Sequence, residues 1–165
     1  ELFQIMSDIF NATINFLKKK NIKILHEDIR PWGGFFVISD CNSRDFINIY
    51  FNGLIKKKLK VSTKLSIKIL IIAPNKRLSW QYHGRRSEVW MVKTGTIKVV
   101  TSHDDIERKK RILKKGDKIS INQGERHRII GMDDYAVVAE IWIHTDKDNP
   151  SDEDDIVRLE SDYDR

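Results

Sequence analysis

The chain has 165 residues, which is one domain's worth at roughly 100–200 residues per domain. Its composition, 40% hydrophobic and 33% charged, excludes disorder throughout, and no run approaches the ~18 apolar residues of a membrane-spanning helix, so we expect no membrane association. The net charge of +6 is uneven: residues 146–165 hold nine acids and three bases, which leaves this tail at −6 and the remaining chain at +12.

The first predicted element is an amphipathic helix over residues 2–20. Apolar residues recur there at helical spacing, and Lys18–Lys20 place positive charge at the end where it complements the helix dipole. We expect this helix to pack on the core, with a dimer contact as the alternative. A short strand over Lys23–Asp28, a loop over Pro31–Gly34 and an apolar strand over Phe35–Ile38 follow.

A second helix is predicted over Ser43–Asn52, ended by Gly53, and the lysine-rich residues Lys56–Lys64 are interpreted as a surface connection. From Ser66 onward the hydrophobicity alternates with period two. About eight strands at ~8–12-residue spacing favour an antiparallel sandwich or barrel. The predicted strands are Ser66–Ala73, Ser79–Tyr82, Glu88–Lys93, Thr96–Thr101, Arg108–Leu113, Lys118–Ile121, His127–Ile130 and Ala136–His144.

The last predicted element is a short helix after Ser151. This serine is followed by the acidic residues Asp152–Asp155 and then by apolar residues, and a serine with an acid three residues later is a helix N-cap pattern. The pattern explains the acids more simply than a calcium site does. Residues 1–29 are then a helical extension with a lead-in strand, and residues 30–165 form one domain.

The basic body of the chain would attract either nucleic acid or small phosphorylated molecules. The lysine runs Lys18–Lys20 and Lys56–Lys58 have no interleaved aromatic residues and no nucleic-acid-binding motif around them. We therefore expect a small phosphate ester as partner, and no nucleic acid. The single cysteine, Cys41, cannot form an internal disulfide, which fits a reducing compartment, so we predict a cytoplasmic protein.

The most informative segment surrounds Gln81, His83 and Glu88. Gln81 and His83 lie two apart on one predicted strand and so project from the same face. Glu88 returns beside them across a tight turn, and His127 follows a turn on a later strand. An amide oxygen, two imidazoles and a carboxylate form a donor set typical of Zn²⁺, Fe²⁺, Mn²⁺, Co²⁺ or Ni²⁺, with open positions for water or substrate. We predict one divalent metal ion.

The spacing from Gln81 through His83 and Glu88 to His127 resembles the two motifs of the cupin superfamily. Gln81 stands where the first histidine of the usual pair lies, and Asn122 stands where the second motif has a proline. The resemblance implies an all-β fold, the cupin double-stranded β-helix (jelly-roll) barrel, here with an N-terminal helix and short peripheral helices.

Four stretches narrow this resemblance. They are Arg30-Pro31-Trp32-Gly33-Gly34, Leu78-Ser79-x-Gln81-x-His83, Arg86-x-Glu88-x-Trp90 and Glu153-Asp154-Asp155-Ile156-Val157-Arg158. From about Arg30 to Arg165 the chain is similar to type II mannose-6-phosphate isomerase, the cupin module also fused to mannose-1-phosphate guanylyltransferases. The chain departs from the family's pattern at Gly84, Trp142 and Asp164, and these departures bear on substrate choice.

The resemblance implies an aldose–ketose isomerase that interconverts mannose 6-phosphate and fructose 6-phosphate. A proton moves between C1 and C2 while negative charge builds on the oxygens, and a divalent cation would stabilise the resulting enediolate. Zinc is the expected metal, with iron, manganese, cobalt and nickel as alternatives. Gln81, His83, Glu88 and His127 would hold it.

Cationic side chains are predicted to serve the phosphorylated substrate. Arg86 and Arg158 match family arginines and are predicted to be catalytic or to orient the substrate, Arg158 by way of the terminal helix folding over the barrel mouth. Arg85, between two metal ligands, and Lys68, at an inward strand position, are predicted to bind substrate. The general base is left open between Lys68 and a metal-bound hydroxide.

Two other functions stay open on the sequence. One is a non-catalytic cupin that binds a sugar phosphate or regulates a polysaccharide pathway, which the departures at Gly84 and Asp164 favour. The other is a different metal cupin enzyme, such as an iron-dependent oxygenase, although such sites favour two histidines and a carboxylate without the extra Gln81. We expect a homodimer, because sheet edges need covering.

Overall fold

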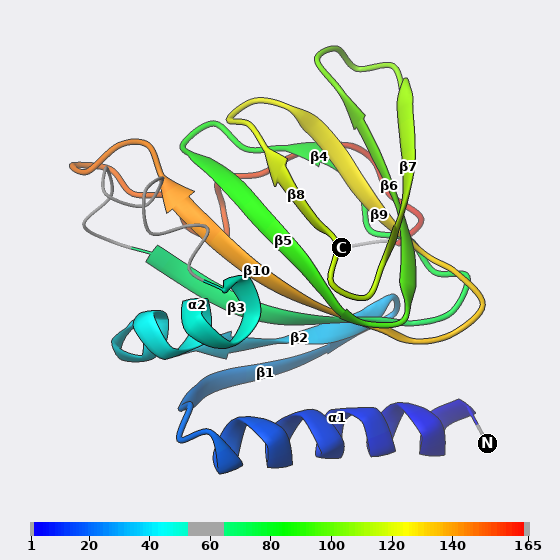
Figure 1. Ribbon diagram of the computed structural model, residues 1–165. Helices are drawn as coiled ribbons and strands as arrows, with labels where there is room; N and C mark the ends of the chain where they lie inside the picture. The colour runs from blue at the N-terminus through cyan, green and yellow to red at the C-terminus, as the bar shows by residue number, and fades with distance from the viewer. Residues whose placement is uncertain (1, 53–64, 164–165) are drawn as a thin grey trace.

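The computed structural model describes residues 2–52 and 65–163 and shows a barrel of two antiparallel sheets (Figure 1). The six-stranded sheet has the order β1-β2-β3-β10-β5-β8, and the five-stranded sheet has the order β11-β4-β9-β6-β7. The predicted all-β architecture is confirmed. The strands are β1 Ile24–Arg30, β2 Gly33–Ile38, β3 Leu65–Ile72, β4 Trp80–Tyr82, β5 Arg86–Thr94, β6 Thr96–Ser102, β7 Lys109–Lys114, β8 Lys118–Ile121, β9 Arg126–Gly131, β10 Ala136–His144 and β11 Val157–Glu160.

Helices cover the outer face of the six-stranded sheet. Helix α1 (Leu2–Lys19) runs beneath β1 and β2, and α2 (Ser43–Phe51) follows the 3₁₀ turn η1 (Asp40–Asn42) (Figure 1). Phe10 and Leu17 of α1 are buried in the outer core, so the predicted core packing of this helix is confirmed. The predicted end of the second helix at Gly53, and the connection Lys56–Lys64, lie outside the described residues.

The central strands are buried on both faces, which explains their nearly continuous apolar runs. On β3, Ile69 and Ile71 face the helices, whereas Leu70 and Ile72 face the second sheet inside the barrel. Because successive side chains point to opposite faces of a sheet, a strand covered on both sides needs apolar residues at every position. An ionisable residue on such a strand therefore lies inside the protein.

Strand β2 begins at Gly33, two residues before the predicted strand at Phe35, and this start depends on glycine. Gly33 has φ +134°, and a Cβ atom there would lie 1.9 Å from the backbone oxygen of Ile71 on the neighbouring strand. No other residue type fits so close an approach in this conformation. The glycines assigned to a loop are thus part of the sheet.

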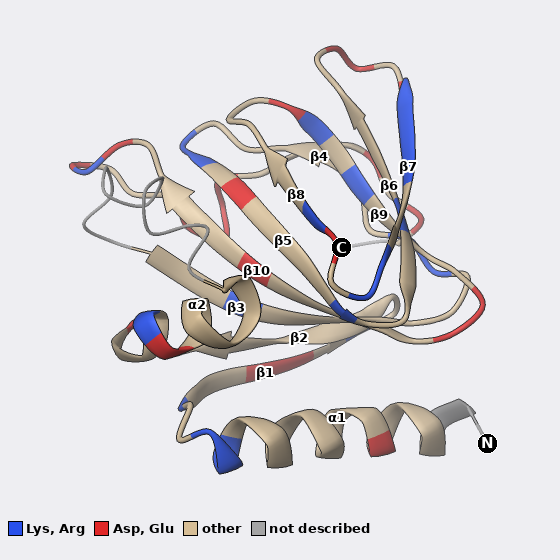
Figure 2. Ribbon diagram, viewed as in Figure 1, with Lys and Arg blue, Asp and Glu red and all other residues tan. Residues whose placement is uncertain are grey.

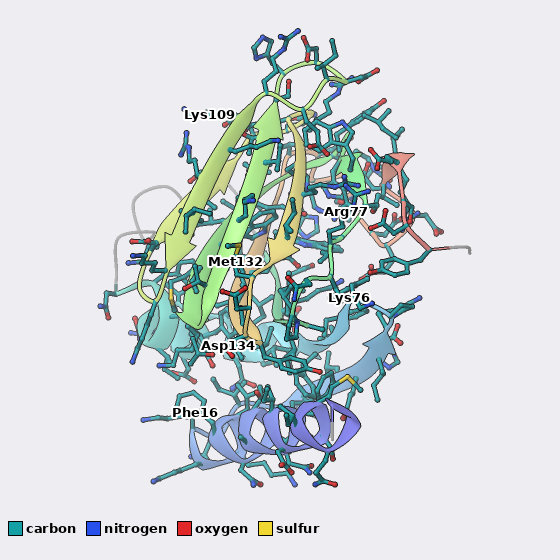
Figure 3. All side chains as sticks on the ribbon, turned by 90° about the vertical axis from the view of Figure 1, so that its right-hand side faces the viewer. Phe16, Lys76, Arg77, Lys109, Met132 and Asp134 are labelled. Atoms are coloured by element: carbon teal, nitrogen blue, oxygen red, sulfur yellow. The ribbon has the colours of Figure 1, made fainter. Side chains whose placement is uncertain are left out.

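The predicted helix after Ser151 is wrong, because the segment forms a turn followed by strand β11. The side chain of Asp152 accepts the backbone N–H groups of Asp154 and Asp155, and the Ser151 hydroxyl donates to Asp155 instead of capping a helix. Strand β11 then pairs with β4 and covers the edge that β4 would otherwise leave open. Arg77 lies beside this C-terminal segment (Figure 3) and donates hydrogen bonds to Glu160 and Asp162.

Among the described helices, none combines the length and the apolar character needed to cross a bilayer. Strand β1 is an edge strand that carries the exposed side chains of Leu25 and Ile29, which are 56% and 58% accessible. The homodimer remains a prediction.

Candidate metal centre

Ionisable side chains interrupt the inner face of the barrel, where charged bands are visible on β5 and β10 (Figure 2). Lys68 of β3, Glu88 of β5 and Glu140 of β10 are all buried. Glu140 lies opposite Lys68 on one side and Trp90 on the other. The pairing of these strands therefore brings the three charged residues into one region of the interior.

Three of the four predicted metal ligands converge there. His83 directly follows β4, Glu88 lies on β5 and His127 on β9, and one ligand atom of each lies within 4.8 Å of the others. His83 Nε2 is 3.2 Å from Glu88 Oε1, and His127 Nε2 is 3.7 Å from Glu88 Oε2. Each of the three residues is only 2% exposed, so water does not screen the cluster.

Backbone carbonyls set the tautomers of both histidines. His83 Nδ1 lies 2.7 Å from the Asp155 carbonyl oxygen, and His127 Nδ1 lies 2.8 Å from that of Glu125. Because a carbonyl oxygen only accepts, each Nδ1 carries the proton and each Nε2 presents a lone pair to the cluster. Within the described part of the chain, His127 Nε2 has no hydrogen-bond partner. An orphaned, buried lone pair in this position fits a metal ion.

The charge states also suit a metal. Burial lowers the pKa of His83 to about 4 and also lowers the pKa of His127, so both imidazoles are neutral at pH 7. Burial alone would raise the pKa of Glu88, but the neighbouring His83, His127 and Arg86 hold it at about 2. Two neutral imidazoles and a carboxylate are donors in the form that a divalent transition metal binds.

Gln81 lies beside this cluster. It pairs with His127 across β4 and β9, and its amide nitrogen lies 3.5 Å from His83 Nε2, while its oxygen accepts the Ser79 hydroxyl. A half turn of the amide exchanges its oxygen and nitrogen, which have nearly the same shape. Gln81 is therefore placed to approach the ligands, and its role as fourth ligand remains a prediction.

Arg86 lies against the predicted metal ligands. Its Nε donates to Glu88 Oε1 over 2.7 Å, its Nη2 lies 3.1 Å from His83 Nε2, and its guanidinium carbon is 3.5 Å from the centre of the Trp142 ring. The lone pair of His83 Nε2 can serve this guanidinium or a metal, but not both. The arginine predicted to be catalytic is thus at the centre of the site.

A cavity of about 110 Å³ opens beside Arg86 and Glu88. Lys68, buried over the rings of Phe35 and Trp142 and paired with Glu153, reaches it from β3. Strand β11 brings Arg158 opposite Gln81. The remaining lining residues are Arg30, Trp32, Phe35, Leu70, Leu78, Ser79, Gln81, Glu140, Trp142, Glu153, Ile156, Arg158, Ser161 and Tyr163.

Glu140 is a site residue that the sequence analysis missed. Its carboxylate accepts the indole N–H of Trp90 over 3.2 Å, and the same N–H also lies 3.1 Å from Glu88 Oε2. Burial and the nearby Glu88 raise the pKa of Glu140 to about 8. The available signal was a lone acid in the strand 136–144, in which every other residue before the terminal His144 is apolar.

Arg85 is separated from the other predicted site residues. Its guanidinium donates to Asn149 and Asp152 over 2.6 and 3.0 Å, and Arg85 is not among the described residues that line the cavity. Its side chain attaches the C-terminal segment to the barrel. The substrate-binding role predicted for Arg85 has no support in this placement.

One family model matches most of the chain. The family model described as mannose-6-phosphate isomerase C-terminal covers residues 43–161, which include every predicted metal ligand. The chain belongs to this family. As a member of the mannose-6-phosphate isomerase C-terminal family, it carries the candidate metal centre within the matched region. No curated protein sequence matches it significantly.

Solved structures agree on the fold. CapF, a capsular polysaccharide assembling protein from Staphylococcus aureus, matches 82% of this chain and 34% of its own, with 18% identity and a TM-score of 0.56. A variant of oxalate decarboxylase OxdC from Bacillus subtilis matches 81% of this chain and 30% of its own, with 13% identity and a TM-score of 0.58. This chain spans about a third of the length of either protein.

A third match is a Cupin 2 conserved barrel domain protein from Salinispora arenicola. It covers 50% of this chain and 66% of its own, with 21% identity and a TM-score of 0.42. The two paired sheets and the first two matches show the predicted cupin jelly-roll fold.

Proposed function

We propose that the protein is a metal-dependent aldose–ketose isomerase of sugar phosphates, with mannose 6-phosphate and fructose 6-phosphate as its substrate pair. One observation carries this proposal. A single cavity is lined by Glu88 of the His83–Glu88–His127 cluster, by a buried carboxyl group that can carry a proton and by several cationic side chains, in a member of the mannose-6-phosphate isomerase C-terminal family. Each group matches one requirement of moving a proton along a phosphorylated sugar.

His83, Glu88 and His127 would hold the metal, with Gln81 as the fourth ligand, and we propose zinc. Two imidazoles, a carboxylate and an amide oxygen leave positions open for a substrate. The bound cation would supply positive charge where the substrate's carbonyl and hydroxyl oxygens become negative. The neighbouring indole N–H of Trp90 keeps the Glu88 carboxylate oriented toward the histidines.

Glu140 is our candidate for carrying the proton between C1 and C2. It lines the cavity, and the Trp90 N–H holds its carboxylate in place. A general base works best when its pKa is near the working pH, and burial brings the pKa of Glu140 to about 8. Lys68 lies opposite Glu140 in the strand register and can balance the carboxylate when the proton leaves.

Arg86, Arg158 and Lys68 would orient the anionic substrate, with Arg30 as an addition to the predicted set. All four line the cavity. Arginine offers a planar fork of donors that matches phosphate oxygens, and it stays charged at every working pH. Arg86 approaches both Glu88 and His83, so it is the cation nearest to the reacting carbons of a substrate bound at the metal ligands.

The test measures proton transfer directly. The purified full chain is stripped with a chelator, reloaded with Zn²⁺, Mn²⁺, Co²⁺, Fe²⁺ or Ni²⁺, and mixed with mannose 6-phosphate in D₂O. NMR follows deuterium entry at C2 and formation of fructose 6-phosphate. We expect turnover only with metal, loss of turnover in His127→Ala, and normal turnover in His103→Ala, a matched change at an exposed histidine outside the site.

Other results would redirect the assignment. Binding of mannose 6-phosphate without exchange or product, across all five metals, would favour the non-catalytic alternative. Co-purified iron with consumption of oxygen would favour the other metal enzyme. Turnover that survives in His127→Ala would overturn the assignment of the metal centre.

A further inference from the structure

The C-terminal residues 145–163, here called the terminal strap, cross the barrel beside the metal ligands. Their last part pairs with β4 as strand β11, and their first part forms the turn at Asp152–Asp155. Asp155 lies at the point where the strap meets His83. Its side chain is only 9% exposed, although the neighbouring acids Asp152 and Glu153 are 60% and 66% exposed.

The Asp155 carboxylate is held by three hydrogen bonds. One oxygen accepts the backbone N–H of Gly84 over 2.9 Å, and the other accepts the backbone N–H of Arg85 over 3.0 Å and the hydroxyl of Ser151 over 2.6 Å. Gly84 and Arg85 directly follow the metal ligand His83 in the chain. The carboxylate therefore fixes the backbone that leaves this ligand.

Two sets of hydrogen bonds connect Asp155 to the metal ligands. Its backbone oxygen accepts Nδ1–H of His83 over 2.7 Å, which sets the tautomer and ring orientation of that histidine. Its carboxylate holds the Ser151 hydroxyl, which in turn accepts Nη1–H of Arg86 over 2.9 Å, and Arg86 donates to Glu88. One residue of the strap thus supports a histidine ligand directly and a carboxylate ligand through two intermediates.

Gly84 leaves room for this contact. A Cβ atom at position 84 would lie 3.3 Å from the Asp155 carboxylate oxygen, which is tight for such a contact. A Cβ atom there would therefore displace the carboxylate by a few tenths of an ångström.

We propose that Asp155 is a positioning residue that holds His83 in the orientation in which its Nε2 can bind the metal and that, through Ser151, holds Arg86 beside Glu88. The proposal rests on the metal centre of the proposed function, but not on the reaction assigned to it. Hydrogen-bond partners of ligating histidines orient the ring, and their loss typically lowers metal affinity by about 10–100-fold.

Titration of the stripped full chain with Co²⁺ tests the proposal. The affinity and the visible absorption spectrum of the bound cobalt are compared in the wild type, Asp155→Asn and Ser151→Ala. Asparagine keeps the size of the side chain but cannot accept all three hydrogen bonds. We expect affinity to fall by about 10-fold or more in Asp155→Asn, with an altered spectrum, and by a smaller factor in Ser151→Ala.

Two variants control for simpler explanations. Asp154→Asn changes an exposed acid one position away, and its affinity should match the wild type. Arg77→Gln removes the hydrogen bonds to Glu160 and Asp162 that attach the other end of the strap. Equal losses in Arg77→Gln and Asp155→Asn would mean that attachment of the strap alone matters, and this result would overturn the proposal.

The remaining outcomes are also decisive. An affinity within twofold of the wild type and an unchanged cobalt spectrum in Asp155→Asn would refute the positioning role. If the wild type binds no cobalt, the metal centre itself fails, and the proposed function fails with it. If Asp155→Asn does not fold, the milder Gly84→Ala displaces the same carboxylate, and its cobalt spectrum must then differ from that of the wild type.

Discussion

The two ends of the barrel interior are lined by inward-facing side chains of the same strands, but these side chains differ in their chemistry. One end is apolar and gains free energy from burial, whereas burial of charge at the other end has a cost that hydrogen bonds and ion pairs must offset. The polar end holds Lys68, Glu88 and Glu140, and the apolar end holds Leu70, Ile72, Val92 and Val138. Because the backbone is shared, the difference between core and site lies in the side chains alone.

Among the changes that distinguish the two ends, we expect Glu140→Gln at the polar end to have the largest effect on activity. The amide keeps the shape of the side chain and can still accept the Trp90 N–H, but it cannot take up a proton. We expect kcat for mannose 6-phosphate to fall by about 10²–10⁴-fold, the usual contribution of general acid–base catalysis, while metal affinity stays close to that of the wild type. Steady-state kinetics and cobalt titration measure the two quantities. A variant that retains most of its activity would remove Glu140 from the mechanism.

At the apolar end, Ile72→Ala should change stability and leave the chemistry alone. Ile72 is fully buried between the two sheets, and its truncation leaves a cavity that costs about 2–5 kcal/mol of unfolding free energy. Urea denaturation measures this loss. The exposed Ile106 is the matched control, for which we expect a change within about 0.5 kcal/mol in Ile106→Ala. A large loss of metal affinity in Ile72→Ala would show that the two ends are not independent.

Metal addition should stabilise the polar end in a measurable way. At a free metal concentration of about 100 times Kd, binding raises the unfolding free energy by about 2.7 kcal/mol, provided that the unfolded chain does not bind. Thermal unfolding with and without a chelator tests this expectation. The same metal should leave His127→Ala unchanged, and equal stabilisation of both proteins would place the binding site elsewhere.

As the pH falls, the terminal strap at the polar end should detach before the strands at the apolar end unfold. Burial would raise the pKa of Asp155, but hydrogen bonds from Ser151, Gly84 and Arg85 hold it below its ordinary value, and the hydrogen bonds from Arg77 lower the pKa of Asp162. Both folded-state pKa values lie below the unfolded value of about 4, so this stabilisation is present above pH 4 and is lost as the pH falls through them.

Hydrogen–deuterium exchange, corrected for the intrinsic rate, measures that order of events. As the pH falls below about 4, we expect protection to fall in the terminal strap while it persists in β6. In Arg77→Gln, the strap should lose its protection from exchange at a higher pH than in the wild type. Of the four predicted effects (Glu140→Gln, Ile72→Ala, metal addition and acid), we expect this one to be the smallest. Simultaneous exchange of the strap and β6 would contradict a separate opening of the polar end.

The sequence was informative wherever a simple period or spacing governed the structure. Strand-length apolar segments between turn residues predicted β8 and β10 with the bounds that the structure shows, Lys118–Ile121 and Ala136–His144. The spacing of His83, Glu88 and His127 predicted their convergence, because a short turn joins His83 to β5 and Gln81, two residues before His83, pairs with His127. These features depend on local rules, so one sequence suffices to find them.

Features that depend on distant partners were not predictable in this way. The acids after Ser151 suit a helix N-terminus, but the open edge of β4 and the Arg77 side chain draw the segment into a strand. The side chain of Arg128 is fully buried and bonded to Glu107, a partner that its neighbours in the sequence do not reveal. Glu140 was missed because its environment is made by three strands and not by its neighbours in the chain.

The terminal strap also bears on the order in which the molecule matures. Residues 145–163 are the last of the described residues to leave the ribosome, so every other strand of the two sheets is synthesised before β11. Until the carbonyl of Asp155 arrives, the imidazole of His83 lacks the partner that orients it. A metal ion that needs His83 in this orientation would therefore find its ligand in place only after the strap has been synthesised.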